Sequence, residues 1–457
     1  MKIRSSLIMI VLMLMTMGCA SFAFGAVSPE EASKLGGPVL TQVGAERAGN
    51  KDGTIPAWTG VPIPIPKAYV KGSGVYVDPF ADEKPLFSIN QKNMAPYADK
   101  LAEGVKALMK RHPDYRIDVY KTHRTMVYPQ WYYDNTKRNA TVCQTINDGR
   151  TLMGNGCHGG APFPLPMTGN EAYWNHTLTF VAPESFSYDC ENYIVTNKGR
   201  VTMATQALDI FDSIWNDPKR EGDPRVTNGL VKFTGPPRRN GEIILASLPL
   251  DFKKRGLIVW QYLPGQRRVR LAPDVCCDTP NAGTGGAAAQ DDAFVFQGDP
   301  DRFTWKLLGK KEMYIPYNAY KIVYYRGDVS KAVQARYLNP DMIRWELHRV
   351  WVVEATLRPD KRHIYAKRIF YADEDTLGFV MADNFDRHGN MYRMTVSYPV
   401  YSYDVQTAFS AFLSFYDLIS NSYAVFSWPR LPGGVQYMKY HSESFFSPDS
   451  IAGGGLR

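Results

Sequence analysis

The stretch from Arg344 to Leu357, RWELHRVWVVEATL, has the alternation of an extended strand. Side chains of a strand point alternately to its two faces, so every second residue shares a face. The turn-like RPDKR and the stretch HIYAKRIFYADEDT follow, and short alternating runs separated by turn residues occupy the chain from about residue 241 onward. This part of the sequence therefore predicts an antiparallel β meander. The odd-numbered, mainly apolar face of the strand carries Trp345, Leu347, Arg349, Trp351, Val353, Ala355 and Leu357.

A hairpin is predicted from Gly256 to Leu271, GLIVWQYLPGQRRVRL, with a type II turn at Pro264 and Gly265. Its first arm is apolar on both faces, so core packing covers one face and helices, an extended arm or a ligand must cover the other. Its second arm alternates arginine with apolar residues, which predicts an interior first arm and a half-solvated second arm. One face of the first arm carries Leu257, Val259 and Leu263, and the other carries Ile258, Trp260 and Tyr262.

Helices are predicted at several places outside the meander. Ser28 caps a short helix that ends at Gly36. Apolar periodicity predicts helices over 94–111 and 203–216, whereas 408–421 fits either a helix or a strand. Alternating prolines at positions 62, 64 and 66 exclude a helix and predict an extended arm that lies along another surface. We therefore divide the chain into residues 1–25, a helix and arm at 26–92, and one large β domain at 93–457.

The first residues resemble a secretory signal. Lys2 and Arg4 precede an apolar run from position 7 to 17, and small residues follow, which predicts cleavage near Gly25 and a periplasmic protein. The alternative is lipid anchoring at Cys19. The formal charge of +8 comes from basic residues that are interspersed with acidic ones, so nucleic acid is not an expected partner.

Five cysteines remain after cleavage at Gly25, in a chain expected to reach an oxidising compartment. Cys143 and Cys157 bracket the loop TINDGRTLMGNG and are predicted to form a disulfide. An odd number leaves one thiol over or paired between chains, and the pairing of Cys190, Cys276 and Cys277 stays open. Because the sequence has no C-x-x-C pair, we expect no zinc site.

Familiar catalytic signatures are missing from the sequence. It contains no G-x-S-x-G, H-E-x-x-H or P-loop motif, so no catalytic residue and no cofactor are predicted. Asp373, Glu374 and Asp375 offer oxygen ligands to a cation, but their place at the end of a strand favours a solvated turn. An enzyme is not excluded, because catalytic groups are assembled in space rather than in sequence.

Several stretches resemble known proteins. WQYLPGQRRVRLAP is similar to the arginine-rich hairpin of the outer-membrane lipoprotein-sorting (Lol-like) superfamily, and FYADEDTLGFVMADNFDRHGNMYRM to the strand–turn–strand that follows it there. More closely, GAERAGNKDGTIPAWTG, LGKKEMYIPYNAY and RWELHRVWVVEATLRPDKRHIYAKRIFYADEDT resemble a bacterial domain-of-unknown-function family that is lipoprotein-sorting-like. Cys276 and Cys277 depart from that pattern, which puts any role carried over for their loop in doubt.

The resemblance implies a β-rich α+β fold, a half-open antiparallel β-barrel with helices packed in its concave side. It also implies a periplasmic carrier for a hydrophobic or lipid-like ligand, accessory to an inner-membrane exporter and an outer-membrane protein. The alternatives are an enzyme acting on a lipid-like substrate and an envelope assembly factor without a ligand.

The sequence suggests four ligand-binding residues for this carrier. Trp260, Tyr262 and Trp351 would line the hollow, or else simply pack in the core. Arg349 stands on an apolar strand face, where an unpaired charge is costly. It must therefore pair with a protein carboxylate, reach solvent, or anchor an anionic lipid headgroup. In the last case Arg368 on the next strand would assist it.

Overall fold

A computed structural model describes residues 27–430 and 432–452 of the chain. The expected signal at 1–25 and the alternative anchor Cys19 lie outside the described residues. No helix within the described residues is long and apolar enough to cross a membrane.

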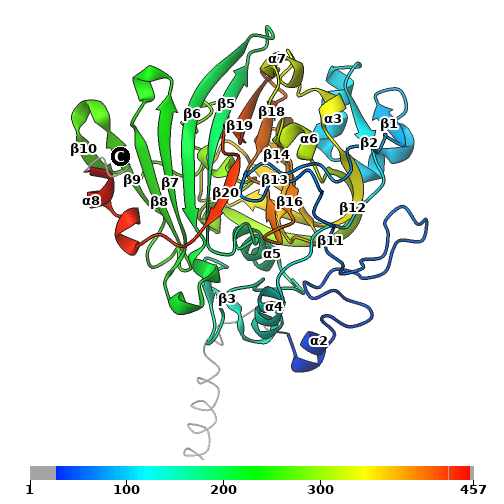
Figure 1. Ribbon diagram of the computed structural model, residues 1–457, viewed down its shortest axis with the longest axis horizontal. Coiled ribbons are helices and arrows are strands. Elements are labelled where there is room, and N and C mark those ends of the chain that lie inside the picture. Colours follow the sequence, from blue (N-terminus) through cyan, green and yellow to red (C-terminus); the bar gives the residue numbers. More distant parts are fainter. Residues whose placement is uncertain (1–26, 431, 453–457) are drawn as a thin grey trace, which may run out of the picture.

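One large sheet of sixteen strands forms the centre of the protein (Figure 1). Neighbouring strands are antiparallel, apart from a single parallel pairing of β2 with β12 at Trp345 and Val119. The strand path has two ends and does not close on itself, which confirms the predicted half-open, mainly antiparallel fold. In order across the sheet the strands are β1 (Phe87–Asn90), β2 (Arg116–Val119), β12 (Trp345–Leu357), β13 (Lys367–Asp373), β14 (Phe379–Phe385), β15 (Met391–Ser397), β18 (Leu413–Asp417), β19 (Ser422–Trp428), β5 (Ser185–Val195), β6 (Val201–Asp212), β7 (Arg225–Gly235), β8 (Ile243–Pro249), β9 (Ile258–Leu263) and β10 (Arg268–Leu271).

Further strands complete the β structure. β11 (Phe303–Pro316) pairs with β12, and β20 (Val435–Met438) pairs with β5. Two small hairpins stand apart from the sheet: β3 (Gln144–Ile146) with β4 (Thr151–Met153), and β16 (Val400–Ser402) with β17 (Thr407–Phe409).

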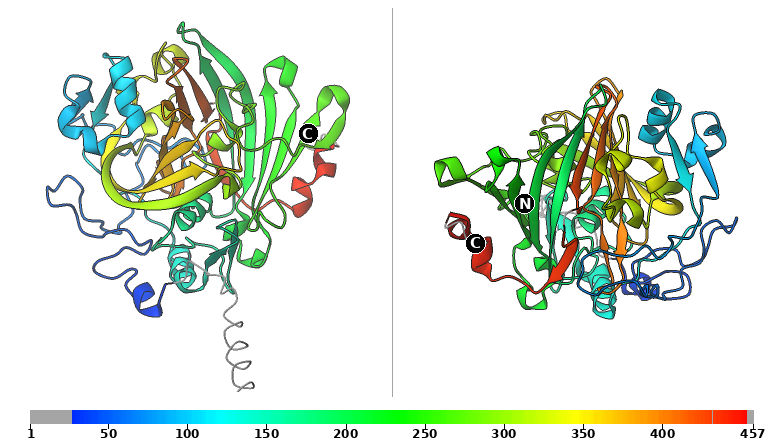
Figure 2. Two further views of the ribbon diagram at one scale, coloured as in Figure 1. Left: turned by 180° about the vertical axis from the view of Figure 1, so that it is seen from behind. Right: turned by 45° about the horizontal axis from the view of Figure 1, so that its top comes forward.

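Short helices and loops cover the sheet on both faces. α3 packs on β15, α5 packs on β11 and β12, and α8 lies against β9 and β10 at the end of the red C-terminal segment (Figures 1 and 2). Val350 and Val352 of β12 belong to one buried apolar cluster, whereas Val353 and Ala355 belong to another. The α-helices are α2 (Pro29–Ser33), α3 (Glu103–Arg111), α4 (Gln130–Val142), α5 (Gly169–Thr177), α6 (Tyr320–Val323), α7 (Val329–Ala332) and α8 (Pro448–Ala452).

The N-terminal segment has the predicted character. Ser28 caps α2 in a capping box with Glu31. Residues 47–86 contain no helix or regular strand and run along the domain surface (Figure 1). The Trp58 indole donates to the Met126 carbonyl at 3.3 Å, and Tyr76 donates to Asp404 at 2.6 Å. These contacts fasten the arm to strands and loops far away in sequence.

Two predicted helices differ from the structure. Residues 94–111 form a 3-10 helix (Ala95–Lys100) and then α3, because the extended Leu101 interrupts them. The helix predicted at 203–216 is wrong, since most of that stretch belongs to β6 and only Ile214–Asn216 is a short 3-10 turn. Its apolar residues also fit a period of two, and pairing between β5 and β7 decides in favour of the strand. At 408–421 the strand alternative is correct.

The hairpin of β9 and β10 forms as predicted, but its turn differs. A 3-10 turn over Pro264–Gln266 replaces the expected type II turn, and Arg267 takes a left-handed conformation with φ 47°. Arg268 and Arg270 are exposed, in agreement with the half-solvated second arm.

Candidate functional site: an apolar hollow under a covering loop

Two adjoining cavities lie on one face of strands β5 to β9, here called the inner face. Their volumes are about 100 Å³ and about 120 Å³. Residues 272–302, here called the covering loop, form most of the opposite wall of the second cavity. At the first cavity, Phe294, Phe296 and Gln297 of this loop share the opposite wall with residues of α5, β14 and β17. The inner-face side chains alternate along each strand with residues of the outer face, as the pleat requires. Those that line the cavities include Phe186, Tyr188, Asp209, Phe211, Thr227, Val231, Phe233, Ile244, Ala246, Leu248 and Val259.

Phe294 of the covering loop stands where the cavities meet. It lines both of them, as does Phe211, and the two rings meet edge to face with centroids 5.6 Å apart. Phe294 and Val295 both have positive φ, at 53° and 73°. A β-branched residue such as Val295 takes this conformation only when its surroundings impose it. The covering loop is therefore held in a specific shape that places the Phe294 ring in the hollow.

A buried ion network holds that shape. Arg368 of β13 is fully buried; its guanidinium donates to Asp292 at 2.8 Å and to the Val295 carbonyl at 3.3 Å. Arg393 of β15 also donates to Asp292, at 3.2 Å. Since desolvated charges must be paired, these contacts tie the loop firmly to the sheet. Arg368 is thus engaged with the covering loop and does not assist Arg349.

The first cavity ends at His176 of α5. Its Nε2 contacts the Phe296 carbonyl at 2.9 Å, and its Nδ1 contacts the Phe379 amide at 3.0 Å. Burial lowers the pKa of His176 to about 4. Neutral and bonded at both nitrogens, His176 is suited to fixing the cavity wall rather than to moving a proton.

The second cavity contains a polar spot on its β5–β6 wall. Tyr188 and Asp209 are directly opposed in the strand register and are almost fully buried. Neither the Tyr188 hydroxyl nor Asp209 Oδ1 makes a hydrogen bond of good geometry among the described residues, but the two side chains interact with each other, and Tyr188 also interacts with Ser427. Burial raises the pKa of Asp209 to about 7. This wall of the second cavity thus contains a buried pair of polar side chains, with Asn192 of β5 also in the lining.

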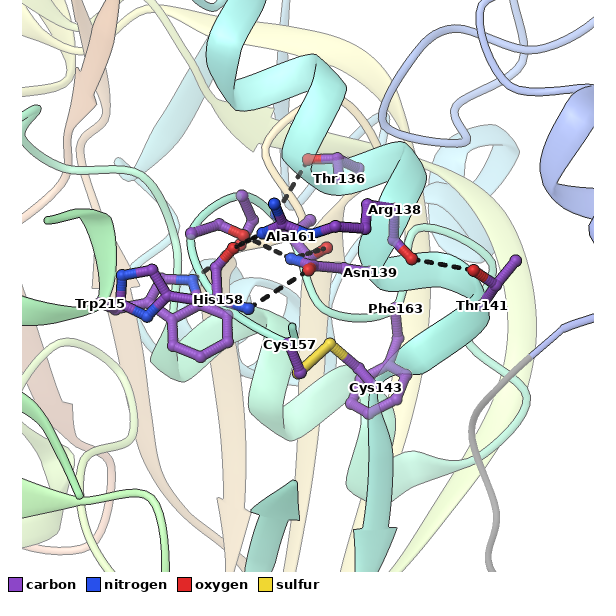
Figure 3. Close-up of a disulfide and its surroundings, with 12 residues drawn as sticks. Thr136, Arg138, Asn139, Thr141, Cys143, Cys157, His158, Ala161, Phe163 and Trp215 are labelled. Carbon is purple, nitrogen blue, oxygen red and sulfur yellow. Dashed lines mark hydrogen bonds between the residues drawn. A yellow bond between two sulfur atoms is a disulfide. The ribbon is translucent and has the colours of Figure 1, made fainter. Parts of the chain in front are cut away.

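A disulfide supports the rim of the first cavity (Figure 3). Cys143, at the end of α4, is joined to Cys157, as expected from the sequence. In the loop that follows Cys157, the Gly160 carbonyl accepts a hydrogen bond from the Trp215 indole at 2.8 Å. The His158 ring contacts the Asp217 carbonyl at 2.7 Å. Trp215 lines the first cavity, so the cross-linked loop positions part of its wall.

The four ligand-binding residues suggested by the sequence all lie outside the linings of these two cavities. Trp260 and Tyr262 are on the outer face of β9, where they pack near Leu245 and Ile451 of α8. Their neighbour Val259 faces the second cavity instead. The C-terminal segment therefore covers the outer face of this arm, and the inner face lines the second cavity.

Arg349 of β12 meets the N-terminal arm, and Trp351 lies beside Lys310 of β11. Arg349 donates to the Ala48 carbonyl at 3.0 Å and lies 3.4 Å from carboxylate oxygens of both Glu46 and Glu374. The Lys310 ammonium sits 4.8 Å from the centre of the Trp351 ring. Of the three alternatives for Arg349, pairing with protein carboxylates is the arrangement observed.

The turn after β13 is not solvated, contrary to the expectation from its charges. Asp373, Glu374 and Asp375 are all at most 2% exposed. Asp375 receives both Nε and Nη2 of Arg124, at 2.9 and 2.6 Å. Ligand atoms of His348, Asp373 and Asp375 lie within 4.8 Å of one another, which is a possible spacing for a metal. The bonds to Arg124 account for Asp375 without one, because they occupy both of its oxygens.

Comparison with known proteins identifies the family of this chain. A family model described as "Protein of unknown function (DUF1329)" matches residues 88–452. The chain belongs to this family. The uncharacterized protein PA3922 of Pseudomonas aeruginosa is 37% identical to it over 447 residues, 96% of each chain. The family resemblance predicted from the sequence is thereby confirmed.

Two solved structures are similar to this DUF1329 protein at low identity. A DUF1329 family protein from Desulfovibrio piger is 16% identical with a TM-score of 0.41, covering 61% of this chain and 95% of that one. A LolA superfamily protein from Nitrosomonas europaea is 12% identical with a TM-score of 0.36, covering 62% and 99%.

Most residues that line the hollow of this DUF1329 protein carry no signal in the sequence that identifies them as such. Phe211 and Asp209 fell in the stretch predicted as a helix, where their shared strand face was hidden. Phe294 lies in a loop without any periodic pattern, so no sequence signal identifies it. The alternation of Leu257 and Val259 in the hairpin was the one signal that pointed to this face.

Proposed function

We propose that this protein is a carrier that binds a hydrophobic or lipid-like ligand in the hollow between the inner face and the covering loop. The observation that supports this most directly is the pair of adjoining apolar cavities, which meet at Phe294. Ligand sites for small molecules are typically concave, largely apolar and equipped with a few polar groups. The resemblance of the hairpin to lipoprotein-sorting proteins points to the same class of ligand.

The size of the cavities adds a condition to this proposal. A dry apolar cavity of roughly 150 Å³ can bind a benzene ring. Each cavity is smaller than that, at about 100 and about 120 Å³, but the two together exceed it. A chain-like ligand must therefore span both, and Phe294 must move aside to let it do so.

The carrier would act in the periplasm, where the signal-like N-terminus would send it. There it would serve an envelope export or lipid-trafficking system, with an inner-membrane exporter and an outer-membrane protein as partners. A protein that shields an apolar chain from water supplies what such a system needs, because exposed apolar surface costs about 25 cal/mol per Å².

The first experiment is to look for the ligand itself. The protein, purified from the periplasm without detergent, would be extracted with organic solvent and the extract analysed by mass spectrometry. A carrier yields a stoichiometric apolar compound. Ala246→Phe, which fills the second cavity, should lose that compound, whereas Ser247→Phe on the outer face of β8 should keep it.

The same preparation distinguishes the alternatives. An assembly factor without a ligand yields no bound compound from either variant or from the wild type. An enzyme converts the extracted compound when protein and compound are incubated together, and the product appears in the mass spectrum.

A further inference from the structure

Two polar groups of the second cavity, the Tyr188 hydroxyl and the Asp209 carboxyl, lie in a lining that is mainly apolar but also includes side chains such as Asn192, Asn281 and Ser427. Tyr188 is 1% exposed and Asp209 is 4% exposed. Asp209 Oδ2 has only a long contact with the Cys190 thiol, at 3.9 Å, while Oδ1 makes no hydrogen bond of good geometry among the described residues. Buried polar groups are nearly always hydrogen-bonded, so each exception needs an explanation.

The residues around Asp209 determine which protonation state of its carboxyl is favourable. Among the described residues that line the second cavity there is no lysine, arginine or histidine. An ionised Asp209 would therefore be a buried charge without a counter-ion, which is very unfavourable. Below its pKa of about 7 the Asp209 carboxyl is mainly protonated, and it then offers one O–H donor together with acceptor oxygens.

The position of the pair suggests what it binds. Tyr188 and Asp209 are opposed across β5 and β6, and both side chains belong to the inner face. A tyrosine hydroxyl, like a protonated carboxyl, both donates and accepts. A ligand hydroxyl matches such a pair, since it can accept from one group and donate to the other. A ligand carboxylate does not, because the lining offers no cation to neutralise it.

We propose that Asp209 and Tyr188 form a hydroxyl anchor within the hollow, so that the preferred ligand is an apolar chain bearing an alcohol group. This inference rests on the proposed carrier function and specifies its ligand class. The apolar remainder of the ligand would lie along Val231, Ile244 and Val259. A site that pairs with a ligand hydroxyl discriminates against analogues lacking it, because its own polar groups are then left without partners.

The test is displacement of the fluorescent probe N-phenyl-1-naphthylamine by two compounds of equal length. 1-Dodecanol has an O–H donor, and 1-methoxyundecane has only an ether oxygen. We expect half-displacement by the alcohol at a concentration about tenfold lower than by the ether, which corresponds to one additional hydrogen bond. Asp209→Leu and Tyr188→Phe should each reduce this preference while leaving displacement by the ether unchanged.

Asp189→Leu is the matched control, because Asp189 is the next residue on β5 and is absent from both cavity linings. It should retain the alcohol preference. Asp209→Asn, which keeps the shape of the side chain, serves as a second variant if Asp209→Leu does not fold.

Three other outcomes of the displacement experiment would each overturn a specific part of the proposal. Equal displacement by alcohol and ether in the wild type overturns the anchor but leaves the carrier intact. Stronger displacement by dodecylamine than by 1-dodecanol overturns the choice of a hydroxyl in favour of a cationic group paired with Asp209. Failure of the probe and of all three compounds to bind overturns the carrier function together with the anchor.

Discussion

Replacing Phe294 by alanine tests whether its ring divides the hollow. The ring lines both cavities, is only partly buried, and meets the Phe211 ring edge to face. If a ligand has to push it aside, then its removal relieves the ligand of that cost. Phe294→Ala should therefore bind chain-like ligands more tightly, although it removes apolar contacts from the wall.

The size of the effect follows from the area involved. An aromatic side chain buries roughly 200 Å² when fully enclosed. Half of that, at about 25 cal/mol per Å², is about 2.5 kcal/mol. Phe294→Ala should thus lower the free energy of unfolding by about 2.5 kcal/mol, compared with about 3–5 kcal/mol for the fully buried Phe296→Ala. A ligand that no longer spends this free energy on displacing the Phe294 ring should bind at least about tenfold more tightly.

The assay is titration with N-phenyl-1-naphthylamine and displacement by 1-dodecanol, alongside thermal unfolding. Phe445→Ala is the matched control, because Phe445 is likewise partly buried but packs on the outer-face cluster near Ile451. It should cost similar stability and leave affinity unchanged. Unaltered or weaker binding by Phe294→Ala, or equal tightening by Phe445→Ala, would show that Phe294 does not partition the hollow.

Four further outcomes are expected. Replacing both Cys143 and Cys157 by serine should cost about 3 kcal/mol of stability, as estimated for a loop of about 15 residues, and should be measured by urea unfolding; an unchanged midpoint would contradict this. Arg349→Met should remain folded and lose about 2 kcal/mol of unfolding free energy, because Glu374 still pairs with Lys310 and Arg124. It should bind acidic and neutral lipids as the wild type does. Selective loss of acidic lipids would revive the proposal that Arg349 anchors a headgroup. Contact with the Cys277 thiol lowers the pKa of Cys276 to about 7, whereas burial raises the pKa of Cys190. Iodoacetamide at pH 8 should therefore alkylate Cys276 in the reduced native protein, and Cys190 only after unfolding. Because burial raises the pKa of Asp209 from about 4 to about 7, its contribution to stability is present at low pH and is lost as the pH rises through this window; Asp209→Asn should flatten the fall in stability between pH 4 and 7, and parallel curves would refute the shift.

The sequence by itself determined the parts of this protein that depend on local pattern. The alternation of Arg344–Leu357 predicts β12, the capping signals at Ser28 predict α2, and the prolines predict the extended arm. The motifs of the hairpin and of β13 were sufficient to predict the family and its half-open sheet. β12, α2 and the arm follow from the period of a strand and the chemistry of single residues, which do not need tertiary contacts. The half-open sheet was implied by the family resemblance alone.

Tertiary structure alone decided which apolar faces meet and what covers them. Residues 203–212 carry apolar residues that suit either period, and only the neighbouring strands make them β6 and turn Asp209 inward. Trp260 and Val259 are equally apolar, yet α8 covers the first and the hollow receives the second. Arg349 needed a partner that the sequence could not name, because Glu46 lies some three hundred residues earlier in the chain. Burial and pairing are set by the whole fold, and so the hollow, the Phe294 partition and the polar spot emerge only when distant segments come together.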